Sequence, residues 1–207
     1  ATMLYFQTIS GIIKMSPHAE GIIIPGGSTM RAVIFDFGGV LAEEGFREGL
    51  LSIGRKNGLD PLQFFQTADR LIYETGYLTG RADEATFWNT LRRTTGIGGS
   101  DRVLRTEILT RFVLRPAMIS GAQRLRSRRL AVAILSDQTN WLDEINAGTP
   151  FFGHFDAVFN SFRTHKSKRD PSVFLDVCTN LDIRPGEALF VDDNIDHIGR
   201  ASKEGLH

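Results

Sequence analysis

Residues 31–41 have the sequence Arg-Ala-Val-Ile-Phe-Asp-Phe-Gly-Gly-Val-Leu, and this stretch decides the fold. Residues 32–35 suit a buried strand, and they run directly into Asp36 and a turn that contains Gly38 and Gly39. A strand that ends this way places its carboxylate at the carboxyl edge of a sheet, where open α/β sheets hold their active sites. Because an aspartate at a strand end can also cap a helix, the rest of the chain has to distinguish the two interpretations.

The same pattern recurs three times further along the chain. Apolar runs at residues 130–135, 156–159 and 188–191 end in Ser136-Asp137, Asn160-Ser161 and Asp192-Asp193-Asn194. Segments with helical periodicity separate these runs, which is the arrangement of βαβ units around a parallel sheet. We therefore expect an α/β fold with a doubly wound parallel sheet and with polar side chains at one edge. The segment 166–171, Lys-Ser-Lys-Arg-Asp-Pro, makes a lysine available there as well.

Four short motifs, in this order, resemble those of the haloacid dehalogenase-like (HAD) superfamily, most of whose members are Mg²⁺-dependent phosphatases. The motifs are residues 36–41 after the first strand, Ser136 after the second, Lys168 before Asp170-Pro171, and the carboxylate pair Asp192-Asp193. The resemblance extends from about Arg31 to the end of the chain. It implies a Rossmann-like core and an α-helical cap.

The resemblance also implies catalytic roles for three of these residues. Asp36 would attack phosphorus and form an aspartyl-phosphate, which splits one difficult step into two. Lys168 would neutralise the phosphate and the nucleophile, and the Ser136 hydroxyl would bind phosphoryl oxygens. A phosphate ester is a poorly reactive dianion, so its hydrolysis needs both a nucleophile and charge neutralisation.

A magnesium ion is implied by the same motifs. Mg²⁺ takes hard oxygen ligands and commonly few of them from the protein. Asp36, Asp193 and the backbone carbonyl of Gly38 would supply these oxygens, and Asp192 would orient them from behind. Clustered carboxylates are costly without a cation, so the metal and the motif support each other.

Gly38 departs from the family pattern, because a second aspartate usually stands there to protonate the leaving oxygen and then to activate water. Glycine cannot move a proton, so three interpretations remain open. The first is a phosphatase of small phosphorylated metabolites with another acid/base, such as Glu43, Glu44 or a group of the substrate. The second is a binding or regulatory domain without turnover. The third is a 2-haloacid dehalogenase, which needs no metal, whereas the paired carboxylates favour one.

Smaller departures surround the same motifs. Arg169 stands where a proline usually follows the motif lysine, and Asp137 replaces the usual asparagine after Ser136. His197 stands at the start of the last helix, and we expect it to form a hydrogen bond behind the metal ligands or simply to lie on the helix face. Lys166 is a rival for the lysine role, although the Asp170-Pro171 register favours Lys168.

Length and composition fit a globular enzyme that acts on a small molecule. The chain has 207 residues, 42% of them hydrophobic, with 24 basic and 24 acidic side chains. This balance gives no indication of a nucleic-acid partner, and no apolar run approaches the length that spans a membrane. The single cysteine, Cys178, excludes an intrachain disulfide and suits a reducing cytosol, so we expect a cytoplasmic protein. The sequence leaves the oligomeric state open.

The positions of the motifs also give the expected domains. Residues 1–29 form a leader, tag-derived or poorly structured, in which residues 21–27 could pair as an edge strand. Residues 30–44 and 115–207 form the core domain, and residues 45–114 form a helical cap that would exclude water and set specificity. Helix-compatible runs in the cap lie at 46–56, 61–73, 83–94 and 101–112. Its aromatic side chains are expected to serve packing: Phe64, Phe65, Tyr73, Phe87 and Trp88.

Overall fold

The computed structural model describes residues 22–23 and 29–207 of the chain. Most of the expected leader, residues 1–29, lies outside the described residues. The expected edge pairing is seen in part, because β1 (Ile22–Ile23) pairs antiparallel with β2 (Thr29–Met30). These two strands form a small sheet of their own, separate from the main one.

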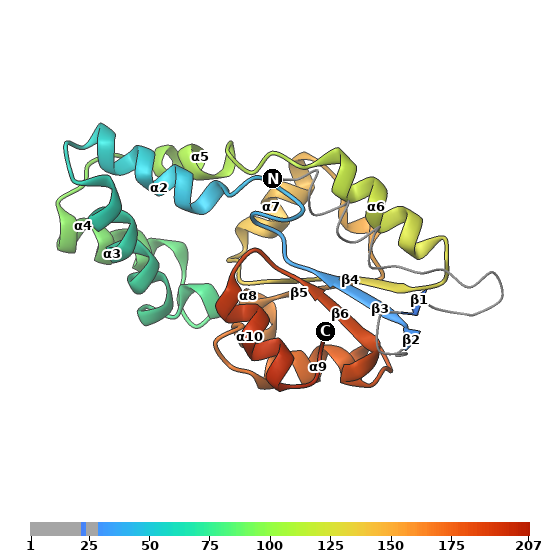
Figure 1. Cartoon of the computed structure of the whole chain (residues 1–207). Helices are drawn as coiled ribbons and strands as arrows, with labels where there is room; N and C mark the ends of the chain where they lie inside the picture. Colours follow the sequence, from blue (N-terminus) through green and yellow to red (C-terminus); the bar gives the residue numbers. More distant parts are fainter. Residues whose placement is uncertain (1–21, 24–28) are drawn as a thin grey trace.

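The main sheet has four parallel strands in the order β5-β4-β3-β6 (Figure 1). They are β3 (Ala32–Phe35), β4 (Ala131–Ser136), β5 (Ala157–Asn160) and β6 (Ala188–Val191). The predicted α/β fold with a doubly wound parallel sheet is therefore confirmed. In the sheet register Phe35 lies opposite Ile134 and Val191, so the residues that follow these strands emerge at one edge.

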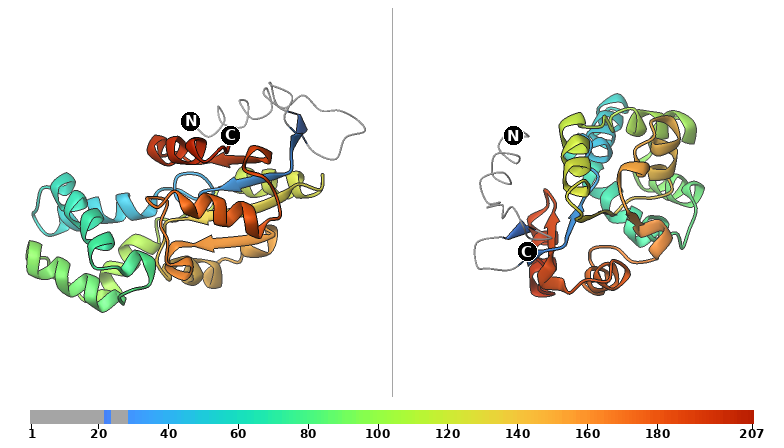
Figure 2. Two further views of the ribbon diagram at one scale, coloured as in Figure 1. Left: turned by 90° about the horizontal axis from the view of Figure 1, so that it is seen from below. Right: turned by 90° about the vertical axis from the view of Figure 1, so that its right-hand side faces the viewer.

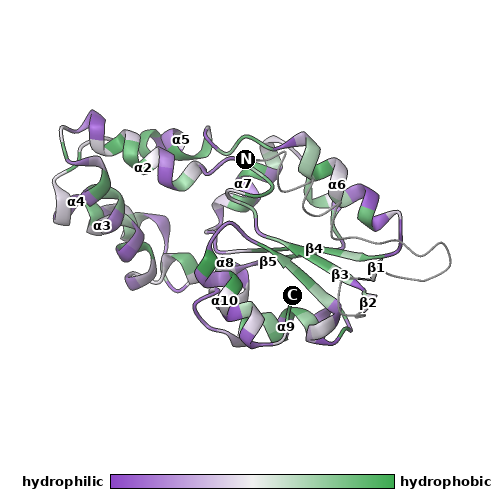
Figure 3. Ribbon diagram, viewed as in Figure 1, coloured by the Kyte–Doolittle hydropathy of each residue, from purple (hydrophilic) through white to green (hydrophobic). Residues whose placement is uncertain are grey.

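Helices cover both faces of the main sheet (Figure 2). Successive strand residues point to opposite faces, so Val33 and Ile34 belong to different hydrophobic clusters. The Val33 cluster includes residues of α6 (Pro116–Arg126) and α7 (Trp141–Gly148). The Ile34 cluster includes residues of α9 (Ser172–Asn180) and α10 (Ile195–Lys203). A short helix, α8 (Ser161–Thr164), follows β5. Apolar residues accordingly concentrate in the strands (Figure 3).

A second body of helices is inserted between β3 and α6, and we call it the helical group. It begins at residue 45 and ends at residue 109, and it lies beyond one end of the sheet (Figure 1). Its elements are α2 (Gly45–Lys56), α3 (Pro61–Glu74), the 3-10 turn η1 (Tyr77–Thr79), α4 (Glu84–Thr95) and α5 (Asp101–Leu109). Asp60, Asp83 and Ser100 each accept a backbone N–H hydrogen bond at a helix start, as good N-cap residues do.

The helical group contacts the sheet body through η1 as well as through its two chain connections. The Ser161 hydroxyl donates to the carbonyl of Leu78 over 2.9 Å, and the Tyr77 hydroxyl donates to Asn140 Oδ1 over 2.6 Å. Gly80 comes so close to α8 that a Cβ there would lie 2.4 Å from the carbonyl oxygen of Phe162. These contacts fix the helical group beside the sheet edge. Among the described residues, no helix combines the length and apolar character that crossing a bilayer requires.

We expect Gly49→Ala to destabilise the protein even though alanine favours a helix. Gly49 lies in α2, and a Cβ there would be 2.7 Å from the Cα of Ile108 in α5. Overpacking of this kind costs about 1–3 kcal/mol, which should appear as a lower free energy of unfolding in urea. Gly199→Ala in α10 is the matched control, because nothing lies within 4 Å of its Cβ position, and it should stabilise by roughly 0.5–1 kcal/mol. Equal effects of the two substitutions would contradict this account of the α2–α5 contact.

Candidate active site

A cavity of about 710 Å³ lies between the carboxyl edge of the main sheet and the helical group. All six residues that the sequence predicted for catalysis or metal binding line it, namely Asp36, Gly38, Ser136, Lys168, Asp192 and Asp193. They come from the segments after β3 and β6, from the last residue of β4 and from the loop before α9. The sheet register explains this meeting, because parallel strands that end at one level deliver their next residues to the same edge.

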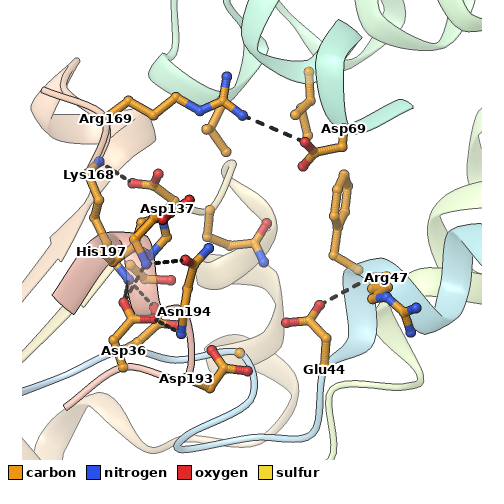
Figure 4. A pocket seen from close by; sticks show the side chains of 18 of the residues that line it. Asp36, Glu44, Arg47, Asp69, Asp137, Lys168, Arg169, Asp193, Asn194 and His197 are labelled. Carbon is orange, nitrogen blue, oxygen red and sulfur yellow. Dashed lines mark hydrogen bonds and ion pairs between the residues drawn. The ribbon is translucent and has the colours of Figure 1, made fainter. Parts of the chain in front are cut away.

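The Lys168 side chain extends toward Asp36 and joins the carboxylates of the cluster (Figure 4). Its Nζ is 2.6 Å from Asp36 Oδ1 and 2.7 Å from Asp192 Oδ2, and its side chain is 1% exposed. The backbone N–H of Lys168 donates to Asp137 Oδ1 over 2.9 Å, which fixes where the side chain starts. Lys166, the rival lysine, instead pairs with Asp176 on α9 and does not line the cavity.

Burial and charge act in opposite directions on these three groups. Burial raises the pKa of Asp36 above its usual range, and Asp192 adds to this rise, although Lys168 opposes it. Burial also acts to raise the pKa of Asp192, but hydrogen bonds and charge from His197 and Lys168 hold it low. Burial alone would lower the pKa of Lys168, and the two carboxylates more than offset it, so the ammonium group stays charged.

Asp192 is held on several sides. Its side chain is fully buried, and besides Lys168 it accepts the backbone N–H of Asn194 over 2.8 Å. His197 Nδ1 lies 3.1 Å from Asp192 Oδ2, so of the two alternatives expected for this histidine the structure has the hydrogen bond to a carboxylate of the cluster. This arrangement fixes Asp192 as a rigid group at the back of the site.

The Asp193 side chain lines the cavity, and its carboxylate lies against the backbone of Gly39. The backbone of Gly39 has φ +76°, a left-handed conformation that favours glycine. A Cβ on Gly39 would lie 2.1 Å from Asp193 Oδ2, so any side chain there would displace this carboxylate. Gly39 therefore serves both the turn and the position of Asp193.

The three aspartates are suited to a divalent cation. Asp36, Asp192 and Asp193 each offer a carboxylate oxygen, and these atoms lie within 4.8 Å of one another. Lys168 contacts two of the three carboxylates, so a further positive charge would relieve their repulsion. Hard oxygen donors of this kind fit Mg²⁺ better than a softer metal.

The two glutamates named as possible acid/base groups differ sharply in surroundings. Glu43 is paired through both carboxylate oxygens with Arg115, which lowers its pKa, and it does not line the cavity. Glu44 does line the cavity, and burial raises its pKa. A Cβ on Gly38 would lie 3.0 Å from Glu44 Oε2, so this carboxylate fills the space beside Gly38.

The helical group supplies one wall of the cavity, and two of the residues that line it were not among those expected from the sequence. Arg47 on α2 and Asp69 on α3 line the cavity, and no motif marks them. Of the aromatic residues expected only to pack, Phe65 and Tyr73 also line the cavity. The others, Phe64, Phe87 and Trp88, are buried in the hydrophobic core as expected. Helical periodicity identifies the buried face of a helix but does not show which partly exposed residue faces a cavity.

Comparison with known families gives one assignment. Residues 30–202 match the haloacid dehalogenase-like hydrolase family. No curated protein matches the chain.

Solved structures share the fold at low sequence identity. A predicted HAD-like family hydrolase from Porphyromonas gingivalis is similar with a TM-score of 0.71, 22% identity and coverage of 86% of this chain and 89% of that one. A HAD family enzyme from Bacteroides thetaiotaomicron, in complex with magnesium and inorganic phosphate, has a TM-score of 0.67, 21% identity and coverage of 86% and 91%. L-2-haloacid dehalogenase from Xanthobacter autotrophicus has a TM-score of 0.63, 22% identity and coverage of 86% and 76%.

We expect Lys168→Met to lower the free energy of unfolding by about 3–5 kcal/mol, because it leaves two buried carboxylates without their cation. The measurement is urea unfolding in EDTA, so that no metal replaces the lost charge. Adding Asp36→Asn should restore part of the loss, since it removes one of the repelling charges. Lys166→Met is the matched control and should change stability little, because the Lys166–Asp176 pair is solvent-exposed. A Lys168→Met protein as stable as the wild type would contradict the central role of this lysine.

Proposed function

The chain belongs to the haloacid dehalogenase-like hydrolase family, and on this premise we propose that it is a Mg²⁺-dependent phosphatase of small phosphorylated metabolites. The observation that carries the proposal is the meeting of Asp36, Lys168 and the Asp192–Asp193 pair in one cavity. A nucleophile, a buried cation and a carboxylate cluster suited to a divalent ion are what phosphoryl transfer requires.

In this proposal Asp36 is the nucleophile. One of its carboxylate oxygens attacks phosphorus, the bond from phosphorus to the ester oxygen breaks, and the phosphoryl group is carried as an aspartyl-phosphate. Water then attacks the phosphorus of this intermediate, which releases inorganic phosphate and restores the carboxylate. The strand end and the contact with Lys168 hold the Asp36 side chain in one place for both steps.

Mg²⁺ would be held by Asp36, Asp193 and the backbone carbonyl of Gly38, and when bound it supplies charge neutralisation for the phosphoryl oxygens. Asp192 orients the cluster from behind, through Lys168, His197 and Asn194. Because Gly39 has no side chain, the Asp193 carboxylate can lie directly beside it.

Lys168 and Ser136 bind the phosphoryl group in this proposal. The Lys168 ammonium group already contacts the nucleophile, so it can neutralise a phosphoryl oxygen next to Asp36 without moving far. Ser136 ends β4, is buried, and lines the same cavity, so its hydroxyl can donate to another phosphoryl oxygen.

Glu44 is the group that we propose to protonate the leaving oxygen. Its carboxylate occupies the space beside Gly38, and no Lys, Arg or His in the described part of the chain forms an ion pair with it. Its other oxygen accepts the backbone N–H of Arg47 over 3.1 Å at the start of α2, which holds the side chain in the cavity. Glu43 is excluded from this role by its double contact with Arg115.

We also propose that residues 45–114 act as a cap on a core formed by residues 30–44 and 115–207. The helical group supplies one wall of the cavity, through residues of α2 and α3. Such a wall excludes water from the reacting groups and contacts the leaving group, so it would select the substrate.

We expect wild-type protein with Mg²⁺ to release inorganic phosphate from at least one member of a panel of phosphorylated metabolites, and EDTA to abolish the release. Asp36→Asn should lower the rate by about 10⁴-fold or more, because the nucleophile is lost. Asp176→Asn is the matched control, since Asp176 lies on α9 and pairs with Lys166 away from the cavity. It should keep the wild-type rate.

Two other outcomes would overturn the phosphatase proposal. Release of chloride from 2-chloropropionate without added metal would favour a haloacid dehalogenase. Absence of turnover on every compound, by folded protein that still binds Mg²⁺, would favour a binding or regulatory domain.

We expect Glu44→Gln to slow the hydrolysis of esters with poor leaving groups, such as alkyl phosphates, by about 10²-fold or more. Esters with good leaving groups, such as 4-nitrophenyl phosphate, should react at nearly the wild-type rate because they leave without a proton. Gln can still accept the Arg47 N–H, so the start of α2 should stay intact. Glu43→Gln is the control and should not distinguish the two classes of ester. The same slowing of both classes by Glu44→Gln would contradict its role as proton donor.

A further inference from the structure

Arg169 crosses from the sheet body to the helical group. It directly follows Lys168 in the chain, but the two side chains diverge, Lys168 toward Asp36 and Arg169 toward α3 (Figure 4). The guanidinium carbon of Arg169 lies 3.4 Å from the centre of the Tyr73 ring, and Nη2 lies 3.6 Å from Asp69 Oδ2. Arg169 and Tyr73 both line the cavity. A cation is therefore held next to the phosphoryl-binding lysine, on the side where a leaving group would lie.

The guanidinium group keeps its hydrogen-bonding capacity. At 3.6 Å the contact with Asp69 is longer than a hydrogen bond, and within the described part of the chain the Arg169 side chain donates no hydrogen bond. A guanidinium group offers five N–H donors in a planar fork that matches carboxylate and phosphate oxygens. Half of the side chain is exposed, so these donors are accessible to a ligand in the cavity.

Tyr73 holds the Arg169 side chain in a defined position, because the tyrosine is itself fixed by a hydrogen bond. Its hydroxyl donates to Asp137 Oδ2 over 3.1 Å, and the backbone N–H of Lys168 donates to the other oxygen of the same carboxylate. The ring that supports Arg169 is thus connected through Asp137 to the backbone of the catalytic lysine. A side chain held in this way loses little entropy when it binds a ligand.

The other two arginines of the cavity wall lack this arrangement. Arg47 Nη1 donates to Glu48 over 2.8 Å, so one of its donors is already used. Its guanidinium carbon lies 5.6 Å from the centre of the Phe65 ring, against 3.4 Å for Arg169 and Tyr73. Arg200 on α10 lines the cavity, but no aromatic ring or carboxylate in the described residues orients it. Among these three arginines, Arg169 is therefore the one that packs directly against an aromatic ring while its side-chain donors form no hydrogen bond within the described residues.

We propose that Arg169 determines substrate specificity by binding a second anionic group, a carboxylate or a phosphate, on the leaving-group side of the substrate. This inference rests on the proposed phosphatase function. It names the substrate class as phosphate esters whose leaving group is itself anionic. Aromatic side chains of the helical group, Phe65 and Tyr73, border the rest of the leaving-group space.

The test compares substrates that differ in one anionic group. 3-Phosphoglycerate carries a carboxylate where glycerol 3-phosphate carries a hydroxymethyl group, and fructose 1,6-bisphosphate adds a phosphate to fructose 6-phosphate. Wild-type protein should prefer the more anionic member of at least one pair, and the preferred pair identifies the anion. Arg169→Gln should raise KM for that member about tenfold, the usual order for one charge-assisted contact. The KM of its partner and both kcat values should stay nearly unchanged.

Arg163→Gln is the matched control, because it makes the same change of charge at an exposed arginine that pairs with Asp143 and does not line the cavity. It should alter neither substrate preference. Arg169→Lys keeps the charge but loses the planar fork, so it should show a smaller rise in KM with the same selectivity. This second variant decides the question if Arg169→Gln does not fold.

Binding measurements separate this inference from the phosphatase proposal. Calorimetric titration of the same four compounds into Asp36→Asn protein with Mg²⁺ requires no turnover. Weaker binding of the more anionic compound, caused by Arg169→Gln in this background, would support the inference even if the wild type releases no phosphate. Equal loss of affinity for both members of each pair would mean that Arg169 only joins the helical group to the sheet body. That outcome, or absence of any wild-type preference, would overturn the proposal.

Discussion

Lys168 neutralises two carboxylates that follow different strands. Because the lysine is buried, the arrangement of the other site residues depends on this pairing. Asp36 follows β3 and Asp192 follows β6, and these strands are neighbours in the sheet. Two carboxylates so close together in a buried setting repel each other, and the ammonium group between them offsets this repulsion. The geometry of the cavity floor depends on this one cation.

The position of the cluster follows from the topology of the sheet. The chain adds β4 and then β5 on one side of β3, and it then crosses to place β6 on the other side. A reversal of this kind leaves a crevice at the carboxyl ends of the two strands that flank it. Asp36 and the Asp192–Asp193 pair occupy the ends of these two strands, β3 and β6. The charged residues therefore lie in this crevice, and the helical group encloses it from outside.

The space beside Gly38 is occupied by a carboxylate from another position in the chain. Gly38 has no group that can move a proton, but the chain returns past it at Glu44, where α2 begins. One oxygen of the Glu44 carboxylate caps the start of α2, and the other occupies the space beside Gly38. Arg169 has a comparable position on the opposite wall, where it joins the loop that carries Lys168 to Tyr73 of α3. Both residues lie where the sheet body and the helical group meet, so this boundary would control both proton transfer and substrate choice.

The sequence by itself determined the parallel α/β sheet, the strand ends and the residues of the cavity floor. Apolar runs that end in Asp36, Ser136 and Asp192 carry this information locally, because a strand and the polar residue that terminates it are adjacent in the chain. The helix boundaries of the helical group were also close, since proline, glycine and N-cap residues mark them. Only the tertiary structure chose Glu44 over Glu43 and brought Arg169 against Tyr73 and Asp69. The physical reason is that the pairing of Glu43 with Arg115 and of Arg169 with Tyr73 joins segments far apart in the sequence, and such distances depend on tertiary packing rather than on any local periodicity.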